Sequence, residues 1–426
     1  MHWRWPGSLS ILQLSISVLC ALRSGCTALG PLVPASWGFS VTSSYENAGS
    51  KQQAYAESGR RSFLRNVVAG AGGIAVGGLA APYVRNATAA EGKTLKVQSL
   101  WTEGTIGFRT FQRWCESVQE LTAGEVTLLP FAGGTIAEIF DMMDATSAGV
   151  LDAMHWVPHY AAITGAMPAG AFLTSFPMGL PHPHQWDMLF ESYGATELAR
   201  ELYARHGLHF VGHVHHDLNL IHSNKPIRSL DDFKGLNLRM PGGLIADCFE
   251  AIGARTVALA GSEVQPALAS GAIDAADFTG PAMNYDLGFA DVSKYIIMGP
   301  TSTPCLHQPV DLTIVAFNQD VWSGLSEPTQ KLLTELVRAF SYEHFAAHQE
   351  ANIAAWADFE AAGVEVTRLS EGDVEQFRKI ALPLWFDWAN RDADSARLFK
   401  LHLDVMLNPA VAYISPDDIK DFELNL

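Results

Sequence analysis

Arg239 lies at the end of an apolar run, directly before a turn. The run reads Gly-Leu-Asn-Leu-Arg and is followed by Met-Pro-Gly-Gly. An arginine at the end of a buried strand can direct its planar guanidinium into a cleft and pair with a carboxylate through two parallel N–H groups. The alternative is an exposed loop arginine in a surface ion pair, and position alone favours neither.

Asp277 ends a second short run, Ala-Ile-Asp-Ala-Ala-Asp-Phe, and is expected to be partly buried. A buried carboxylate needs a cation or hydrogen-bond donors, so Arg239 and a hard metal ion are both plausible partners. Gln308 offers an amide oxygen. With Asp277 and nearby backbone carbonyls it would form an all-oxygen set suited to Ca²⁺ or Na⁺, not Zn²⁺. The alternative is an internal ion pair without a ligand.

The run His213-x-His215-x-Asp217 predicts a different chemistry. It resembles the metal-binding core of metallo-β-lactamase-type hydrolases, in which imidazoles and a carboxylate hold zinc that activates water. That motif continues with a histidine, where this chain has Leu218. The alternative is that His215, Asp217 and Asn219 alternate onto one strand face, from which Asn219 could donate to a ligand oxygen.

Aromatic and polar residues follow another predicted strand. Trp156, His159 and Tyr160 could line a small-ligand pocket, although core packing is an equal alternative for each. The glycine turns at 104–107 and 241–243 match neither a phosphate loop nor a dinucleotide fingerprint, and no Gly-x-Ser-x-Gly elbow is present. We therefore expect a binding protein and not an enzyme, with a periplasmic zinc-dependent hydrolase as the alternative.

The elements that would position these residues alternate between β-rich runs and amphipathic helical patterns. The predicted strands are 95–101, 126–131, 151–156, 209–215, 219–223, 235–239, 256–259 and 272–278. The predicted helices are 106–122, 136–147, 184–206, 244–252, 262–270 with Ser262 as its cap, 327–361 and 370–389. This alternation predicts an α/β fold with helices over mainly parallel sheet. Trp156, His215, Arg239 and Asp277 fall at or near strand carboxyl ends, where open α/β sheets bind ligands. Two such domains facing each other would place them in a cleft.

Composition narrows the class of protein. The 426 residues are enough for two domains and an N-terminal extension, and 48% of them are hydrophobic. The formal net charge of −17 argues against a nucleic-acid partner. Cys115, Cys248 and Cys305 contain no close pair, which excludes a disulfide scaffold and a Cys-rich zinc site.

Residues 60–90 have the pattern of a twin-arginine export signal. The pair Arg60-Arg61 precedes a mildly apolar, Gly/Ala-rich run and then Ala-Thr-Ala at 87–89, the spacing a signal peptidase accepts. We expect a periplasmic protein. The alternative is a chance arginine pair before a buried helix. Residues 1–59 precede this signal and are a leader of doubtful status.

Three stretches in order resemble the solute-binding subunits of tripartite ATP-independent periplasmic (TRAP) transporters. They are 234–242, 252–257 and 265–275, and the resemblance extends over most of 95–390. It implies a periplasmic-binding-protein-like fold of two α/β domains, with hinge strands and a ligand cleft between them. Domain I would comprise 91–214 with parts of 310–426, domain II 215–309, and a long connecting helix 327–361.

The resemblance also implies a site. In that family an arginine at the position of Arg239 binds the substrate carboxylate. The branch that takes 2-oxo and 2-hydroxy acids holds a cation beside the substrate, and the resemblance assigns Asp277, the carbonyl of Phe278 and Gln308 to that cation. Asp and Gln in place of two Glu residues resemble the lactate-binding, calcium-using variants, which favours Ca²⁺ over Na⁺.

The predicted substrate-binding residues are Arg239, Asn219, Trp156 and Phe278. The implied partners are a small organic carboxylate and two membrane subunits of a TRAP transporter. Relatives are often dimers, so a homodimer is possible, with the apolar stretch 398–407 as a candidate contact.

Overall fold

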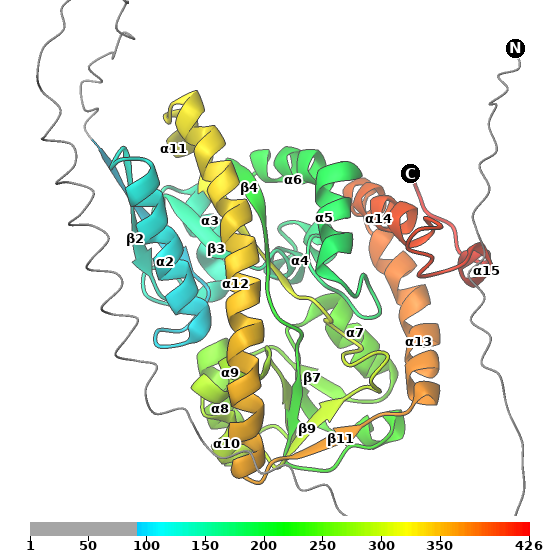
Figure 1. The fold of residues 1–426 in the computed structure, drawn as a ribbon. Coiled ribbons are helices and arrows are strands. Elements are labelled where there is room, and N and C mark those ends of the chain that lie inside the picture. Colours follow the sequence, from blue (N-terminus) through cyan, green and yellow to red (C-terminus); the bar gives the residue numbers. More distant parts are fainter. Residues whose placement is uncertain (1–91) are drawn as a thin grey trace, which may run out of the picture. The chain divides into compact units, whose positions relative to one another are not determined.

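Two β-sheets organise residues 92–426, the part of the chain that the computed structural model describes (Figure 1). The predicted signal at 60–90 and the leader at 1–59 lie outside these residues. Within 92–426, no helix combines the length and apolar character needed to cross a lipid bilayer.

The first sheet, with the helices around it, forms what we term lobe I. Its strand order is β2-β1-β3-β10-β4. These strands are β1 (Lys93–Ser99), β2 (Val126–Phe131), β3 (Ala153–Trp156), β4 (Leu208–His215) and β10 (Leu312–Asn318). The lobe I helices are α2 (Ile106–Leu121), η1 (Ile139–Asp141), α3 (Met142–Ser147), α4 (His159–Thr164), η2 (Pro168–Phe172), α5 (Pro183–Ser192), α6 (Ala195–Ala204) and α11 (Gln319–Ser323).

The second sheet, with its helices, forms lobe II. Its strand order is β11-β9-β5-β8-β6-β7. These strands are β5 (Ile221–Ser223), β6 (Asn237–Arg239), β7 (Arg255–Val257), β8 (Ala275–Asp277), β9 (Tyr295–Met298) and β11 (Glu365–Arg368). The lobe II helices are η3 (Leu230–Phe233), α7 (Gly243–Ala251), α8 (Gly261–Ser270), α9 (Pro281–Asp286) and α10 (Phe289–Val292).

The chain passes between the lobes along paired extended segments. One follows β4 and the other precedes β10. The His216 amide donates to the Asp311 carbonyl at 2.7 Å, and the Asp311 amide donates to the Asp217 carbonyl at 3.0 Å. This pairing continues the antiparallel β4–β10 ladder, so the two crossings act as one hinge.

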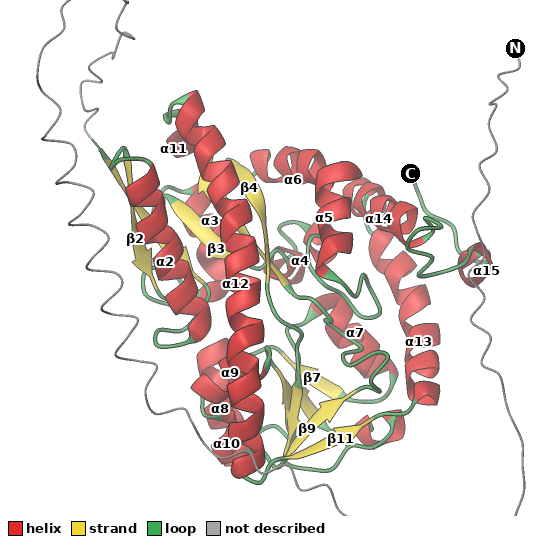
Figure 2. Ribbon diagram, in the orientation of Figure 1, coloured by secondary structure: helices red, strands yellow, loops and turns green. Residues whose placement is uncertain are grey.

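Helix α12 (Glu327–Ala361) runs alongside both lobes (Figures 1 and 2). It begins at Ser326, whose side chain accepts from the Thr329 amide. It packs on α2 and β4 in lobe I and on α9 in lobe II. In lobe I, the Phe340 ring stacks on Trp114 of α2 with ring centroids 5.2 Å apart. The chain ends with α13 (Glu371–Ala389), α14 (Ala393–Met406) and α15 (Pro416–Ile419).

The predicted α/β class is confirmed, and the predicted helix 327–361 has the bounds of α12. Both sheets are mixed, however, because β5 and β10 run antiparallel to their neighbours where the chain crosses between lobes. The predicted helix 184–206 is two helices that break at Gly194, with a φ of +90°. Helix α8 is preceded by Ala260, so Ser262 is not its cap.

The apolar stretch 398–407 is not an open face. Leu398, Phe399, Val405 and Met406 are fully buried within the described part of the chain. Their side chains fill the core between α14, α13 and the neighbouring helices of lobe I. These four side chains are therefore not available to a second copy, whereas Leu401 and Leu407 of the same stretch are only partly buried. The dimer contact stays a prediction.

Candidate functional site

A cavity lies where the strand ends of the two lobes face each other. It encloses about 590 Å³ of space up to its open mouth. Lobe I contributes Trp101, which follows β1, together with His159 and Tyr160 of α4. Lobe II and the hinge contribute Asn219, Arg239, Asp277, Phe278, Gln308 and Asp311. Five of the six residues predicted to bind substrate or cation thus line this cavity, and Trp156 is the exception.

Arg239 is 3% exposed, and protein acceptors already hold most of its guanidinium. Nη1 donates to the Asp277 carbonyl at 2.7 Å and to the Asp277 carboxylate at 3.1 Å. Nε and Nη2 both donate to the Leu259 carbonyl, at 3.3 and 3.2 Å. A guanidinium has five N–H groups, so these contacts leave one for a ligand. The bidentate geometry expected from the sequence is therefore not available in this arrangement.

Asp277 is fully buried between two basic side chains. Its Oδ2 accepts from Arg239, and its Oδ1 lies 2.7 Å from Nε2 of His307. Burial alone would lower the pKa of His307, but Cys305 and Asp277, on opposite sides of the imidazole, raise it to about 10. His307 is therefore protonated at neutral pH, and Asp277 forms an ion triad with two cations.

His307 was missed from the sequence, although it stands next to Gln308. The imidazole donates to a carboxylate from one edge and contacts the Cys305 sulfur at 3.5 Å from the other. A histidine that lies in the sequence between a cysteine and a predicted ligand residue does not form a recognisable motif. Only the approach of β8 to the segment after β9 reveals its role.

Asn219 and Gln308 are hydrogen-bonded to each other. The Asn219 amide nitrogen donates to Gln308 Oε1 at 2.8 Å, and the Asn219 backbone donates to the Gln308 carbonyl at 3.0 Å. Asn219 Oδ1 is buried and has no hydrogen-bond partner among the described residues. Asn219 thus presents an acceptor toward the cavity, whereas the sequence had suggested a donor.

Asp311 is a further cavity residue that the sequence did not single out. Its Oδ1 accepts from the Thr174 hydroxyl at 2.9 Å and from the Leu312 amide at 2.8 Å. Burial raises its pKa to about 7 despite these hydrogen bonds, and the nearby Asp277 carboxylate adds to the rise. Asp311 therefore carries only part of a negative charge near neutral pH, and the cavity has a net positive balance.

The two lobes touch at a glycine turn. His159 of α4 donates through Nε2 to the Gly242 carbonyl at 2.9 Å. Gly242 and Gly243 have φ angles of +97° and +56°, and a Cβ on Gly243 would approach His159 Cε1 to 2.9 Å. Glycine is needed here for the backbone conformation and for the close approach of the opposite lobe. This contact closes one side of the cavity.

Trp156 does not line the cavity. Its side chain is fully buried, and its indole N–H donates to the Ile139 carbonyl at 2.7 Å. It packs against Tyr160, with ring centroids 5.9 Å apart, and so supports the residue that does reach the cavity. Burial raises the pKa of Tyr160, which keeps its hydroxyl protonated as a potential donor. Phe278 lies under Arg239, whose guanidinium carbon is 5.3 Å from the ring centroid.

The proposed cation ligands do not fit a hard cation as they are arranged. Both Asp277 oxygens contact basic groups, and Gln308 Oε1 accepts from Asn219. A buried cation next to Arg239 and protonated His307 would also meet uncompensated positive charge. Asn219 Oδ1 is the one buried side-chain acceptor of the cavity without a hydrogen-bond partner in the described part of the chain.

The predicted zinc motif does not assemble. Strand β4 ends at His215, and the Asp217 carboxylate turns toward α12, where it accepts from Gln349 at 2.9 Å and from Asn352 at 2.6 Å. A Cβ on Gly280 would meet Asp217 Oδ2 at 1.7 Å, so this carboxylate is tightly enclosed. His215, Asp217 and Asn219 therefore do not share a strand face, because the chain leaves the sheet between them.

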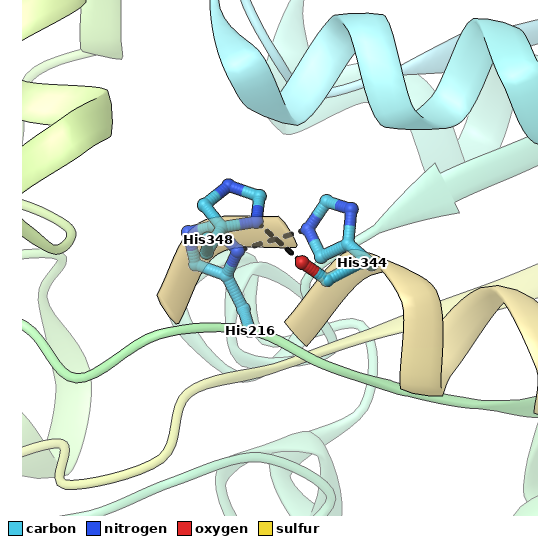
Figure 3. Close-up of side chains that lie close together, drawn as sticks. All are labelled: His216, His344 and His348. Carbon is cyan, nitrogen blue, oxygen red and sulfur yellow. Dashed lines mark hydrogen bonds between the residues drawn. The ribbon is translucent and has the colours of Figure 1, made fainter. Parts of the chain in front are cut away.

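A group of buried histidines joins the hinge to α12. Figure 3 shows His216 facing His344 and His348, which lie one turn apart on the helix. His216 Nδ1 is 2.9 Å from His344 Nε2, and His348 Nδ1 donates to the His344 carbonyl at 2.7 Å. Burial lowers the pKa of all three imidazoles. The His216 ring packs at a tilt against Trp101, with centroids 4.4 Å apart, which connects this cluster to the cavity wall.

Comparison with known proteins identifies relatives along most of the described chain. Residues 97–392 match the model of DctP, described as bacterial extracellular solute-binding protein, family 7. A monocarboxylate 2-oxoacid-binding periplasmic protein of Nostoc sp. is 25% identical over 306 residues, which cover 72% of this chain and 82% of that protein.

Two solved structures extend the comparison. A TRAP periplasmic solute-binding protein from Rhodobacter sphaeroides, in an apo open state, has 28% identity and a TM-score of 0.59, covering 75% of this chain and 99% of its own. One from Colwellia psychrerythraea, with bound calcium and pyruvate, has 20% identity and a TM-score of 0.68, covering 76% and 98%.

The family is one of transport proteins, and nothing in these relatives supports the hydrolase alternative. The match spans both lobes, the hinge and all of α13. The chain belongs to the bacterial extracellular solute-binding proteins of family 7, the periplasmic solute-binding subunits of TRAP transporters.

Proposed function

We propose that this protein captures a small organic monocarboxylate, a 2-oxo or 2-hydroxy acid such as lactate, and delivers it to two membrane subunits of a TRAP transporter. The observation that carries the proposal is the charge balance of the cavity. Arg239 and His307 supply two positive charges against the Asp277 carboxylate and Asp311, whose pKa burial raises to about 7. An enclosed site with this balance favours one added anionic group.

The remaining donors suit an anion of that kind. Arg239 keeps one N–H for a ligand oxygen, and the protonated Tyr160 hydroxyl lines the same cavity. Asn219 Oδ1 is a buried acceptor that a 2-hydroxyl group could satisfy. The Nostoc relative is named for 2-oxoacid binding and the Colwellia structure holds pyruvate, which supports the same ligand class.

A hard cation beside the acid, Ca²⁺ before Na⁺, is the second candidate. It is favoured by the calcium in the Colwellia structure and by the unpartnered Asn219 Oδ1. Its binding through Asp277 would require His307 or Arg239 to leave the carboxylate. Gln308 and the Phe278 carbonyl would complete the proposed ligand set.

Calorimetry of the purified protein tests both proposals. Lactate and pyruvate should bind, and lactamide, which lacks the carboxylate, should not. Each titration is repeated with Ca²⁺, with Na⁺ and with a chelator. A lower affinity for the acid in the presence of the chelator would support a bound cation. An unchanged affinity would mean that Arg239 and His307 alone balance the negative charge of the ligand. Absence of saturable binding by any monocarboxylate would refute the ligand class.

Export and assembly are further proposals. We infer twin-arginine export from Arg60-Arg61, so changing both to lysine should leave the precursor in the cytoplasm. A homodimer stays a prediction, and sedimentation at several protein concentrations tests it. A monomer at every concentration would contradict it.

A further inference from the structure

A second polar cluster lies on lobe I, at a cavity separate from the carboxylate site. His213 and His215 stand two residues apart on β4, so their side chains share one face of the sheet. Asp187 of α5 lies against them. His213 Nε2 is 3.0 Å from Asp187 Oδ1, and His215 Nε2 is 3.2 Å from the same oxygen. These are the two histidines of the sequence motif, with Asp187 in the place expected for Asp217.

The geometry of the three ligand atoms suits a metal ion. All three lie within 4.8 Å of one another. Ligands on a tetrahedral Zn²⁺, with bonds of about 2.0–2.1 Å, are about 3.3–3.4 Å apart. The two separations that involve Asp187 are close to that edge length, and the two imidazole nitrogens lie within 4.8 Å of each other. Side-chain movements within this cluster would place one ion among the three.

His215 is held loosely by the same carboxylate oxygen as His213. Its side chain is only 8% exposed, and its Nε2 lies 3.2 Å from Asp187 Oδ1 without a well-aligned hydrogen bond within the described residues. A buried imidazole nitrogen without a well-aligned partner is costly, and coordination of an ion that also binds Asp187 and His213 would satisfy it.

The cluster opens into a cavity that encloses about 1320 Å³ of space, open solvent at its mouth included. His184 and Glu191 line this cavity and flank Asp187 on α5 at three and four residues, one turn to either side. Asp187 is half exposed, so an ion can enter without unfolding. All three proposed ligand residues line this cavity.

We propose that Asp187, His213 and His215 bind one first-row divalent metal ion, Zn²⁺ in preference to the hard cations. Two imidazoles and one carboxylate are borderline ligands that suit Zn²⁺, Ni²⁺ or Cu²⁺ better than Ca²⁺. The ion would join α5 to β4 within lobe I. It is independent of the carboxylate cavity and of the hydrolase that the sequence motif had suggested.

The histidine trio of Figure 3 is a weaker metal site. His216, His344 and His348 are fully buried and include no carboxylate. Two of them already hydrogen-bond to each other. A divalent ion there would carry its charge into the interior without a compensating anion among its ligands.

Titration of chelator-treated, untagged protein with Zn²⁺ tests the proposal, and the visible spectrum of bound Co²⁺ reports the ligand geometry. We expect one saturable equivalent and a higher melting temperature with Zn²⁺. Loss of a residue that only supports a metal ligand already costs about 10- to 100-fold in affinity, so His215→Gln and Asp187→Asn should each cost at least that much.

His209→Gln is the matched control, because it removes an imidazole from the same strand but outside the cluster, where the ring stacks on Trp322. It should leave Zn²⁺ affinity unchanged, and all three variants should retain carboxylate binding. If His215→Gln fails to fold, Asp187→Asn decides alone, since it alters a half-exposed helix residue. No saturable Zn²⁺ binding, or equal affinity in Asp187→Asn, overturns the proposal.

Discussion

Asp277→Asn removes the negative charge that holds Arg239 and His307 together. The carboxylate is fully buried, 2.7 Å from His307 and 3.1 Å from Arg239. Breaking a buried ion pair by removing one partner typically costs about 3–5 kcal/mol. His307 can lose its proton once its partner is gone, which relieves part of the cost, but Arg239 cannot. We therefore expect the free energy of unfolding to fall by about 3 kcal/mol, at the lower end of that range.

Urea denaturation measures this change, and Asp274→Asn is the control. Asp274 lies three residues earlier, pairs with the exposed Lys225 at 2.8 Å and accepts from the Asn237 amide at 3.0 Å. An ion pair with an exposed partner contributes about 0–1 kcal/mol, and an asparagine oxygen can still accept from Asn237, so the control should lose less than Asp277→Asn. If Asp277→Asn costs no more than Asp274→Asn, the ion triad does not stabilise the fold and the reasoning is refuted.

The same variant separates the two accounts of the ligand site. If Asp277 only pairs with the basic groups, its loss frees N–H groups of Arg239, and lactate binding in the presence of a chelator should persist. If Asp277 binds a cation that bridges to the acid, its loss should abolish binding, and a chelator should weaken binding by the parent protein. Calorimetry with and without chelator, on parent and variant, distinguishes these results.

Three further predictions concern the site, closure and pH. Arg239→Lys should weaken lactate binding about ten- to a hundredfold, since a charge-assisted hydrogen bond contributes about 1.5–3 kcal/mol. The control Arg255→Lys changes an exposed arginine and should leave the affinity unchanged. If calorimetry gives Arg239→Lys the same affinity as the parent protein, Arg239 does not belong to the site. Gly243→Ala places a Cβ 2.9 Å from the opposite lobe at a φ of +56°. The resulting strain of about 1–3 kcal/mol should open the cleft, and small-angle scattering should show a larger radius of gyration. An unchanged radius of gyration and an unchanged lactate affinity would contradict this. Burial lowers the pKa of His155 from 6.5 to about 3. As the pH falls below about 6.5, the imidazole is therefore protonated in the unfolded chain before it is protonated in the folded protein. This difference should lower the free energy of unfolding by about 1.4 kcal/mol per pH unit. His155→Gln should reduce the slope of unfolding free energy against pH, measured between about pH 4 and 6, by about one proton; an unchanged slope would show that His155 is not neutral in the fold.

Local sequence predicted most elements because their signals are local. The strand 126–131 and the helix 327–361 match β2 and α12 in their bounds, since hydrophobic periodicity and the Ser326 cap are properties of neighbouring residues. The α/β class followed from that alternation. Arg239 and Asp277 were placed at strand ends for the same reason, and the fold brings both to one cavity.

What each side chain contacts was decided by tertiary structure. His307 reaches Asp277 from a segment 30 residues away, and Asp187 reaches His213 across 26 residues. The spacing of these residues in the sequence does not predict either pairing, because the partners belong to different elements that meet only after the sheets assemble. Strand direction in β5 and β10 was likewise fixed by the crossings between lobes. The sequence by itself determined the elements, the family resemblance and the candidate residues. The fold alone determined that most of Arg239 is already bound by protein, because the acceptors that hold it come from β8 and the segment after β7.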